Sequence, residues 1–105
     1  MLSTHPLAAA RQRVAEIDSA ELRRRVAAGA RLIDVREPHE TRGGGIDGAI
    51  LMPLGDLLAD PSAVAATAPV VVVCAKGLRA RRAAEALRER GVDARVLAGG
   101  LAAWT

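Results

Sequence analysis

Aromatic residues are nearly absent from this chain of 105 residues, which has no Phe, no Tyr and one Trp, Trp104. Half of the residues are hydrophobic, so the core must be built mainly from the small aliphatic side chains of Ala, Val and Leu. Proteins that bind single-stranded nucleic acids usually stack the bases on aromatic rings. The net charge is only +3 and the charges are spread along the chain, so we expect no nucleic-acid binding.

Cysteine is equally scarce, because Cys74 is the only one in the chain. A single cysteine cannot form an internal disulfide, and it excludes zinc sites built from several cysteines. We expect no metal and no cofactor. No segment has the run of about 20 apolar residues that a membrane helix needs, and the N-terminus lacks a charged leader. We expect a cytoplasmic protein that does not bind membranes.

Short apolar runs alternate along the chain with stretches of helical periodicity. The apolar runs predict short strands at residues 14–17, 31–35, within 46–52, 70–74 and 94–97. Helices are predicted from Asp18 or Ser19 to Gly29, from Pro38 to the glycines 43–45, and at residues 53–58, 62–66, 80–90 and 101–104. Strands that alternate with helices indicate right-handed βαβ units and an α/β fold with a small parallel sheet. We assign residues 14–105 to one domain and residues 1–13 to an N-terminal arm or short helix.

The strongest strand signal lies just before the cysteine. Residues 70–73 are four consecutive valines without polar alternation, which is typical of a central parallel strand covered on both faces. Cys74 follows at the carboxyl end of this strand, and open parallel sheets bind their ligands at the carboxyl ends of strands. The loop after this strand is therefore the first place to look for a functional site.

The loop after Cys74 has features that can activate a thiol. Gly77 permits backbone angles that a Cβ would obstruct, and successive N–H groups of such a loop can converge on an anion at the start of the next helix. This field favours the thiolate over the thiol, and Lys76 and Arg79 add positive charge. An unpaired cysteine at the end of a buried strand can also be an inert apolar residue. The glycine and the two cations favour the reactive thiol.

Four segments occur in the order and spacing of the signatures of single-domain rhodaneses. They are LIDVREPHE at residues 32–40, GIDGAILMP at 45–53, VVVCAKGLR at 71–79 and VLAGGLAAW at 96–104. The chain resembles this family from Val14 to Trp104. The resemblance implies a five-stranded parallel sheet flanked by helices on both faces. It also implies a sulfurtransferase in which the loop cysteine carries a persulfide.

The resemblance also implies roles for individual residues. Cys74 matches the catalytic nucleophile of the family. Asp34 and Arg36 match a pair that braces the active-site region, and Trp104 matches a late tryptophan that packs the terminal helix. The residues that match the substrate-binding loop, whose amides line the pocket, are Ala75, Lys76, Gly77, Leu78 and Arg79. Ala80 departs from the family, where Ser or Thr is frequent, and we expect slower turnover without that hydroxyl.

The function expected from these residues is transfer of a sulfane sulfur from an anionic donor, thiosulfate or a persulfide, to a thiol, cyanide or a protein acceptor. One alternative is a non-catalytic sulfur carrier or a redox-sensing or binding module, because an exposed reactive thiol suits sensing as well as transfer. Another is a cysteine phosphatase or arsenate reductase, in which an arginine six positions after the cysteine clamps the oxyanion. That position is Ala80 here and Arg79 comes one position early, which disfavours this second alternative.

Overall fold

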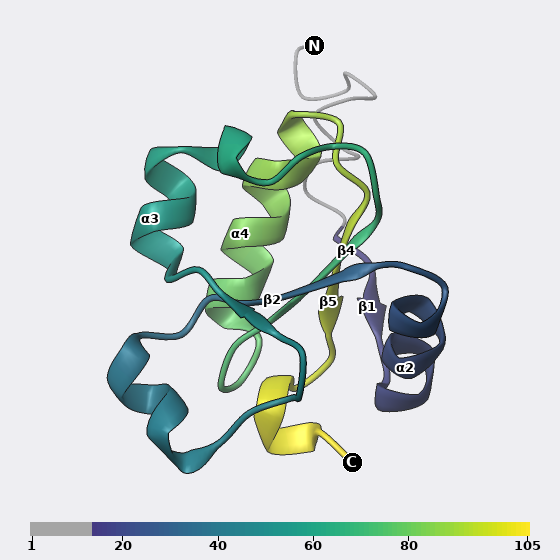
Figure 1. The fold of residues 1–105 in the computed structure, drawn as a ribbon, viewed down its shortest axis with the longest axis vertical. Helices are drawn as coiled ribbons and strands as arrows, with labels where there is room; N and C mark the ends of the chain where they lie inside the picture. The colour runs from purple at the N-terminus through teal and green to yellow at the C-terminus, as the bar shows by residue number, and fades with distance from the viewer. Residues whose placement is uncertain (1–13) are drawn as a thin grey trace, which may run out of the picture.

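The computed structural model describes residues 14–105, and the predicted N-terminal arm or helix, residues 1–13, lies outside the described residues. A five-stranded sheet, with the strand order β1-β5-β4-β2-β3, forms its centre (Figure 1). Each strand pairs in parallel with its neighbours. The strands are β1 (Glu16–Ile17), β2 (Arg31–Asp34), β3 (Ile50–Leu51), β4 (Val70–Val73) and β5 (Ala94–Leu97). The predicted α/β fold with a small parallel sheet is confirmed for this part of the chain.

Helices cover both faces of the sheet (Figure 1). On one face lie α3 (Leu54–Ala59) and α4 (Leu78–Glu89), and on the other lies α2 (Ser19–Ala27). Within residues 14–105, three short 3₁₀ helices complete the fold, and they are η2 (Pro38–Gly43), η3 (Pro61–Ala63) and η4 (Gly100–Ala103). Because η2 follows β2 and η4 follows β5, both lie at the same end of the sheet as the loop after β4. No helix within residues 14–105 is long and apolar enough to span a membrane.

The central strand β4 is buried on both faces, as its four valines predict. Val70 and Val72 pack in the cluster that includes Leu57 of α3 and the apolar face of α4. Val71 and Val73 pack in the cluster on the α2 side. None of the four is more than 1% exposed, and burial of each valine contributes about 1.5–3 kcal/mol. The residue that follows β4 therefore starts from a tightly packed support.

The prediction that the helix after this strand starts at Ala80 is wrong by two residues, because α4 begins at Leu78. Gly77 takes a left-handed backbone conformation, with φ +108°, and caps the start of the helix. The loop therefore ends two residues earlier than predicted. Leu78 and Arg79 therefore belong to the first turn of α4, and the connecting loop has only the residues from Cys74 to Gly77.

Two further helix predictions need correction. The helix expected at residues 62–66 is reduced to the single turn η3, because Val64 is extended and packs into the core at 4% exposure. The terminal helix is the 3₁₀ turn η4, and Trp104 is extended directly after it. Trp104 packs against the α2-side core, where the guanidinium of Arg23 lies 4.3 Å from the centre of its ring.

The start of α2 agrees with the predicted cap, since the Asp18 carboxylate accepts a hydrogen bond from the Glu21 N–H at 2.8 Å. We expect Asp18→Ala to lower the free energy of unfolding by about 1 kcal/mol, because a donor in the first turn loses its partner. Asp18→Asn should stay close to wild type, since asparagine caps equally well. Urea denaturation measures both variants, and an equal loss in the two would contradict the capping role.

Candidate active site

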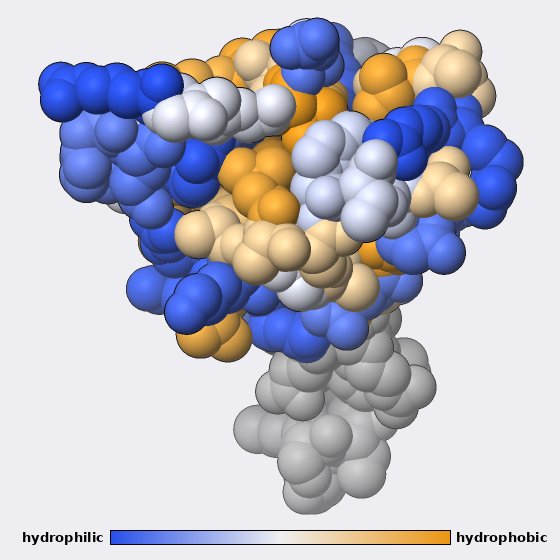
Figure 2. All heavy atoms as spheres, turned by 90° about the horizontal axis from the view of Figure 1, so that it is seen from below, coloured by the Kyte–Doolittle hydropathy of each residue, from blue (hydrophilic) through white to orange (hydrophobic). Residues whose placement is uncertain are grey.

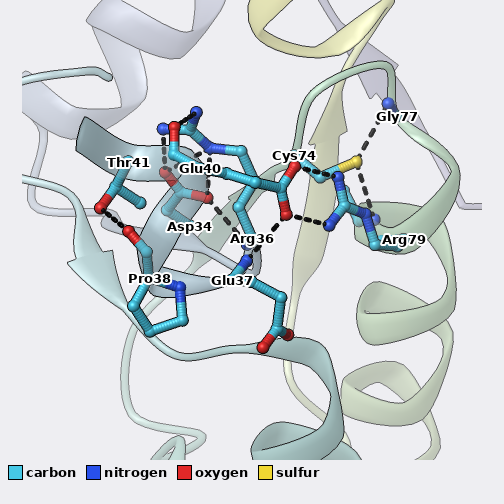
Figure 3. A network of polar contacts seen from close by, with 10 residues as sticks. Asp34, Arg36, Glu37, Pro38, Glu40, Thr41, Cys74, Gly77 and Arg79 are labelled. Carbon is cyan, nitrogen blue, oxygen red and sulfur yellow. Dashed lines mark hydrogen bonds and ion pairs between the residues drawn. The ribbon is translucent and has the colours of Figure 1, made fainter. Parts of the chain in front are cut away.

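The candidate site lies at the carboxyl ends of β2 and β4, which are neighbours in the sheet. Asp34 is in register with Val73, so the residues that follow the two strands emerge side by side. Cys74 follows directly after Val73. Figure 3 shows this end of the sheet, with Cys74 on one side and a chain of polar contacts from Asp34 through Arg36 and Glu40 to Arg79. The structure therefore brings the predicted nucleophile and the predicted bracing pair to one place.

The sulfur of Cys74 accepts two backbone hydrogen bonds. The N–H of Gly77 donates to Sγ at 3.0 Å and the N–H of Ala80 at 3.3 Å. Ala80 lies in the first turn of α4, where backbone N–H groups have no partner in the preceding turn and the helix dipole is positive. N–H groups aimed at an atom in this way favour negative charge on that atom. The residue as a whole is only 1% exposed.

Four further N–H groups of the loop and the first turn of α4 have no partner within residues 14–105. Among residues 14–105, the N–H groups of Ala75, Lys76, Leu78 and Arg79 donate to no other group. Unpaired N–H groups in a glycine-containing loop at a helix N-terminus form a concave site for an anion. The predicted substrate-binding loop therefore has donors available for a bound anion.

The back of the loop is held by η4, a contact that sequence reasoning missed. The N–H of Leu101 donates to the Cys74 carbonyl at 2.8 Å, and the N–H of Ala102 donates to the Ala75 carbonyl at 3.1 Å. Gly100, with φ +64°, lies so close that a Cβ there would be 2.6 Å from three backbone atoms of residues 74–76. The glycine pair at residues 99–100 was the available signal, although the sequence pattern indicated only a turn. Only a glycine allows this approach.

Asp34 and Arg36 form a buried ion pair, at 4% and 7% exposure. Arg36 Nη2 lies 2.8 Å from Asp34 Oδ2, and the same guanidinium donates to the carbonyls of Glu40 at 3.0 Å and Gly44 at 2.9 Å. The hydrogen bonds from Arg36 to Asp34 raise the pKa of Arg36 above its ordinary value. Arg36 thus connects the end of β2 to the middle of η2 and to the residue that follows it, which is compatible with the predicted bracing role.

Glu40 is another residue that sequence reasoning did not single out, although it ends the signature-like segment at residues 32–40. Its carboxylate binds Arg79 with two hydrogen bonds, from Nη1 to Oε1 at 2.6 Å and from Nη2 to Oε2 at 2.9 Å. The two residues are 39 positions apart, so no local pattern could have paired them. Arg79 therefore connects the start of α4 to η2.

Comparison with known proteins matches the model of the rhodanese-like domain to residues 18–105. This chain belongs to the rhodanese-like domain family. The uncharacterized protein YqhL of Bacillus subtilis is 41% identical over 76 residues, which make up 71% of this chain and 60% of that protein. The reduced CoADR-RHD of Bacillus anthracis has a TM-score of 0.78 and 36% identity, over 83% of this chain and only 16% of that one. A human single-domain sulfurtransferase has a TM-score of 0.71 and 30% identity, over 84% of this chain and 92% of that one.

The outer side of the rhodanese-like loop is open to solvent. Leu78 is 78% exposed, and Lys76 is exposed without a hydrogen bond or ion pair to any residue within 14–105. Figure 2 views the molecule from this end, where apolar and hydrophilic patches alternate on the surface. In the described residues, no group of three or more His, Cys, Asp or Glu side chains is placed to hold a metal ion. The chemistry that this site offers is therefore that of a cysteine among N–H donors and cations.

The ion pair between Glu40 and Arg79 predicts a pH dependence of stability. Hydrogen bonds from Arg79, with a further one from the backbone of Glu37, lower the pKa of Glu40 from 4.5 to about 2. Since the pKa is lower in the folded state, the charged carboxylate stabilises the fold above pH 4.5, and this stabilisation is lost as the pH falls through about 2.

We expect the difference in unfolding free energy between wild type and Glu40→Gln to be constant from pH 7 to 5 and to shrink below pH 4.5. Urea denaturation across this range measures it. A difference that persists unchanged to pH 2 would show that the carboxylate charge does not contribute.

Proposed function

We propose that this rhodanese-like domain is a sulfurtransferase, which moves a sulfane sulfur from an anionic donor to a thiol or cyanide through a persulfide on Cys74. The observation that carries the proposal is the sulfur of Cys74, which accepts N–H bonds from Gly77 and Ala80 at the start of α4. A thiolate in this position is both stabilised and nucleophilic. The relative described as a human single-domain sulfurtransferase supports the same reaction class.

In the first half-reaction, the Cys74 thiolate attacks the outer sulfur of thiosulfate. A sulfur–sulfur bond forms on Cys74 while the sulfur–sulfur bond of thiosulfate breaks, and the electron pair of that bond leaves with sulfite. Lys76 is exposed and unpaired within residues 14–105, so its charge is available to attract the anionic donor and to stabilise the leaving sulfite. A persulfide anion remains on the cysteine.

In the second half-reaction, a thiolate or cyanide attacks the outer sulfur of the persulfide. With cyanide the products are thiocyanate and the regenerated Cys74 thiolate, so no oxidant or reductant is needed. The N–H groups of residues 75–79 that lack other partners belong to the loop and helix start that follow Cys74, and in this proposal they bind the outer sulfur between the two steps. The physiological acceptor in this proposal is a small thiol or a thiol of a partner protein.

Phosphatase and arsenate reductase chemistry is less well supported. Those reactions need a free guanidinium that binds two oxygens of the oxyanion. Arg79 already uses both terminal nitrogens to bind Glu40, and it stands one position early. A sulfur carrier that loads once without turnover is the competing function to test.

The test is intact-protein mass spectrometry of the wild type after incubation with thiosulfate, followed by a steady-state assay with cyanide. We expect the mass to rise by one sulfur atom, the added sulfur to be lost on addition of cyanide, and thiocyanate to form over many turnovers. Loading without repeated thiocyanate formation would assign the carrier role. Absence of loading from thiosulfate and from glutathione persulfide would overturn the proposed function.

A further inference from the structure

Arg36, Lys76 and Arg79 lie on the segments that follow β2 and β4, and these three cations differ in whether their charge is free. Arg36 is buried and bound to Asp34. Arg79 is bound at both terminal nitrogens by Glu40. Lys76 is exposed, and no acidic side chain within residues 14–105 pairs with it. Two of the three cations are therefore balanced by a carboxylate of the same chain.

The positive charge of Arg79 interacts with two negative groups, the carboxylate of Glu40 and the sulfur of Cys74. The hydrogen bonds that Arg79 donates to the Glu40 carboxylate raise the pKa of Arg79 above its ordinary value, and a negative charge on Cys74 adds to this effect. Both the carboxylate and a charged cysteine sulfur therefore stabilise the positive charge of the guanidinium. An incoming anionic donor at Cys74 must compete with Glu40 for this charge.

Glu40 is held in place by more than its ion pair. The N–H of Glu37 donates to Glu40 Oε1 at 3.0 Å, and Arg36 donates to the Glu40 carbonyl at 3.0 Å. Because its pKa is about 2, the carboxylate is charged throughout the physiological range. Glu40 is thus a charged carboxylate held beside Arg79 by two contacts besides the ion pair.

We propose that Glu40 determines the charge preference of the site, by holding Arg79 in a neutral pair and leaving Lys76 as the free cation for the donor. This inference rests on the sulfur-transfer function proposed above and names the property of the donor that Glu40 controls. Glu40 limits the preference for anionic over uncharged donors. Its removal should therefore increase that preference instead of merely weakening the site.

A pair of alkylating reagents tests the charge preference directly, because Cys74 is the only cysteine and each reagent modifies one site. Iodoacetate is an anion, and iodoacetamide is its uncharged analogue of nearly the same size. In both reactions the thiolate forms a sulfur–carbon bond while the carbon–iodine bond breaks and iodide leaves. The ratio of the two rate constants cancels changes in thiolate fraction and loop exposure, which affect both reagents alike.

We expect Glu40→Gln to raise the ratio of iodoacetate to iodoacetamide rates by about threefold to tenfold at low ionic strength, because one negative charge beside the site is removed. The increase should largely disappear in 1 M salt, where charges are screened within about 3 Å. Glutamine keeps an oxygen that can accept the hydrogen bond from the Glu37 N–H, so the start of η2 keeps this contact. Arg79→Gln alone should lower the ratio, since it leaves Glu40 uncompensated.

The matched control is Glu21→Gln, which removes a carboxylate that also pairs with arginines, Arg24 and Arg25, but on the exposed surface of α2. It changes the net charge equally and should leave the ratio at the wild-type value. In the double variant Glu40→Gln, Arg79→Gln, both charges of the pair are absent, and the ratio should return close to wild type.

An unchanged or lowered ratio in Glu40→Gln would overturn the inference, as would equal slowing of both reagents or a protein that reacts with neither. The labelling rates do not depend on sulfur transfer, so a failure of the proposed function is detected separately, as absence of a persulfide on the wild type. Thiosulfate and an uncharged dialkyl trisulfide then extend the comparison to sulfur compounds. The Cys74 thiolate takes the outer sulfur of thiosulfate and releases sulfite, whereas with the trisulfide it forms a sulfur–sulfur bond while one sulfur–sulfur bond of the trisulfide breaks and an alkyl thiolate or alkyl persulfide leaves. A higher ratio of thiosulfate to trisulfide rates in Glu40→Gln would support the inference. An unchanged ratio would overturn the inference for these compounds.

Discussion

Cys74→Ser is expected to abolish sulfur loading and to reduce thiocyanate formation to the rate of the uncatalysed reaction. A serine hydroxyl at the end of β4 can accept the N–H bonds of Gly77 and Ala80, so the loop keeps its conformation. It cannot hold a persulfide, and its oxygen is a weak nucleophile without an adjacent base. The loss of activity therefore arises from the chemistry of the sulfur and leaves the fold intact.

Intact-protein mass spectrometry after thiosulfate treatment measures the loading, and urea denaturation checks that the serine variant is folded. Ala80→Ser provides a useful comparison, because it adds a hydroxyl in the same turn and leaves the sulfur in place. We expect that variant to load sulfur. Persulfide formation on Cys74→Ser would place the reaction elsewhere and contradict the assignment.

Gly100→Ala is expected to lower the free energy of unfolding by about 3–5 kcal/mol and to impair sulfur loading. The alanine must adopt a positive φ, and its Cβ would lie 2.6 Å from three backbone atoms of residues 74–76. These atoms belong to the backbone and cannot rotate away as a flexible side chain can. Relief of the clash must move either η4 or the loop that holds the sulfur.

Gly91→Ala is the matched control for this substitution. Gly91 also has a positive φ, of +84°, but a Cβ there meets nothing within 4 Å. The free energy of unfolding of Gly91→Ala should fall by about 1–2 kcal/mol, because alanine is strained in the left-handed conformation. The variant should load sulfur at the wild-type rate. If Gly100→Ala were no less stable than Gly91→Ala and equally active, the contact with η4 would not be what holds the loop.

The two predictions concern the two sides of one loop. Its front side presents N–H groups at the Cys74 sulfur, and its back side is bound through the Cys74 and Ala75 carbonyls to the N–H groups of η4. A loop bound on both sides needs little rearrangement when charge develops on the sulfur, and such preorganisation is a general source of catalytic rate. The ion pair of Glu40 and Arg79 then links the start of α4 to η2.

The sequence alone determined the support of the site, because the signals for it are local. Four valines specify a buried strand, Cys74 follows it, and Gly77 introduces the helix whose first turn binds the sulfur. The family signatures predicted Cys74 as the nucleophile, the loop that binds the donor and the pair of Asp34 and Arg36. Element ends were less accurate, since the start of α4 depends on the backbone conformation of Gly77, which the sequence permits but does not require.

The tertiary structure decided which groups meet around that support. The sheet order places β2 and β5 on either side of β4, and this order brings η2 and η4 against the loop from opposite sides. This arrangement lets Glu40 form an ion pair with Arg79, and it brings Gly100 against the backbone of residues 74–76. The sequence shows that Arg79 is charged, but it does not show which carboxylate pairs with it. The fold assigns that partner, because the contact joins residues that no short-range periodicity relates.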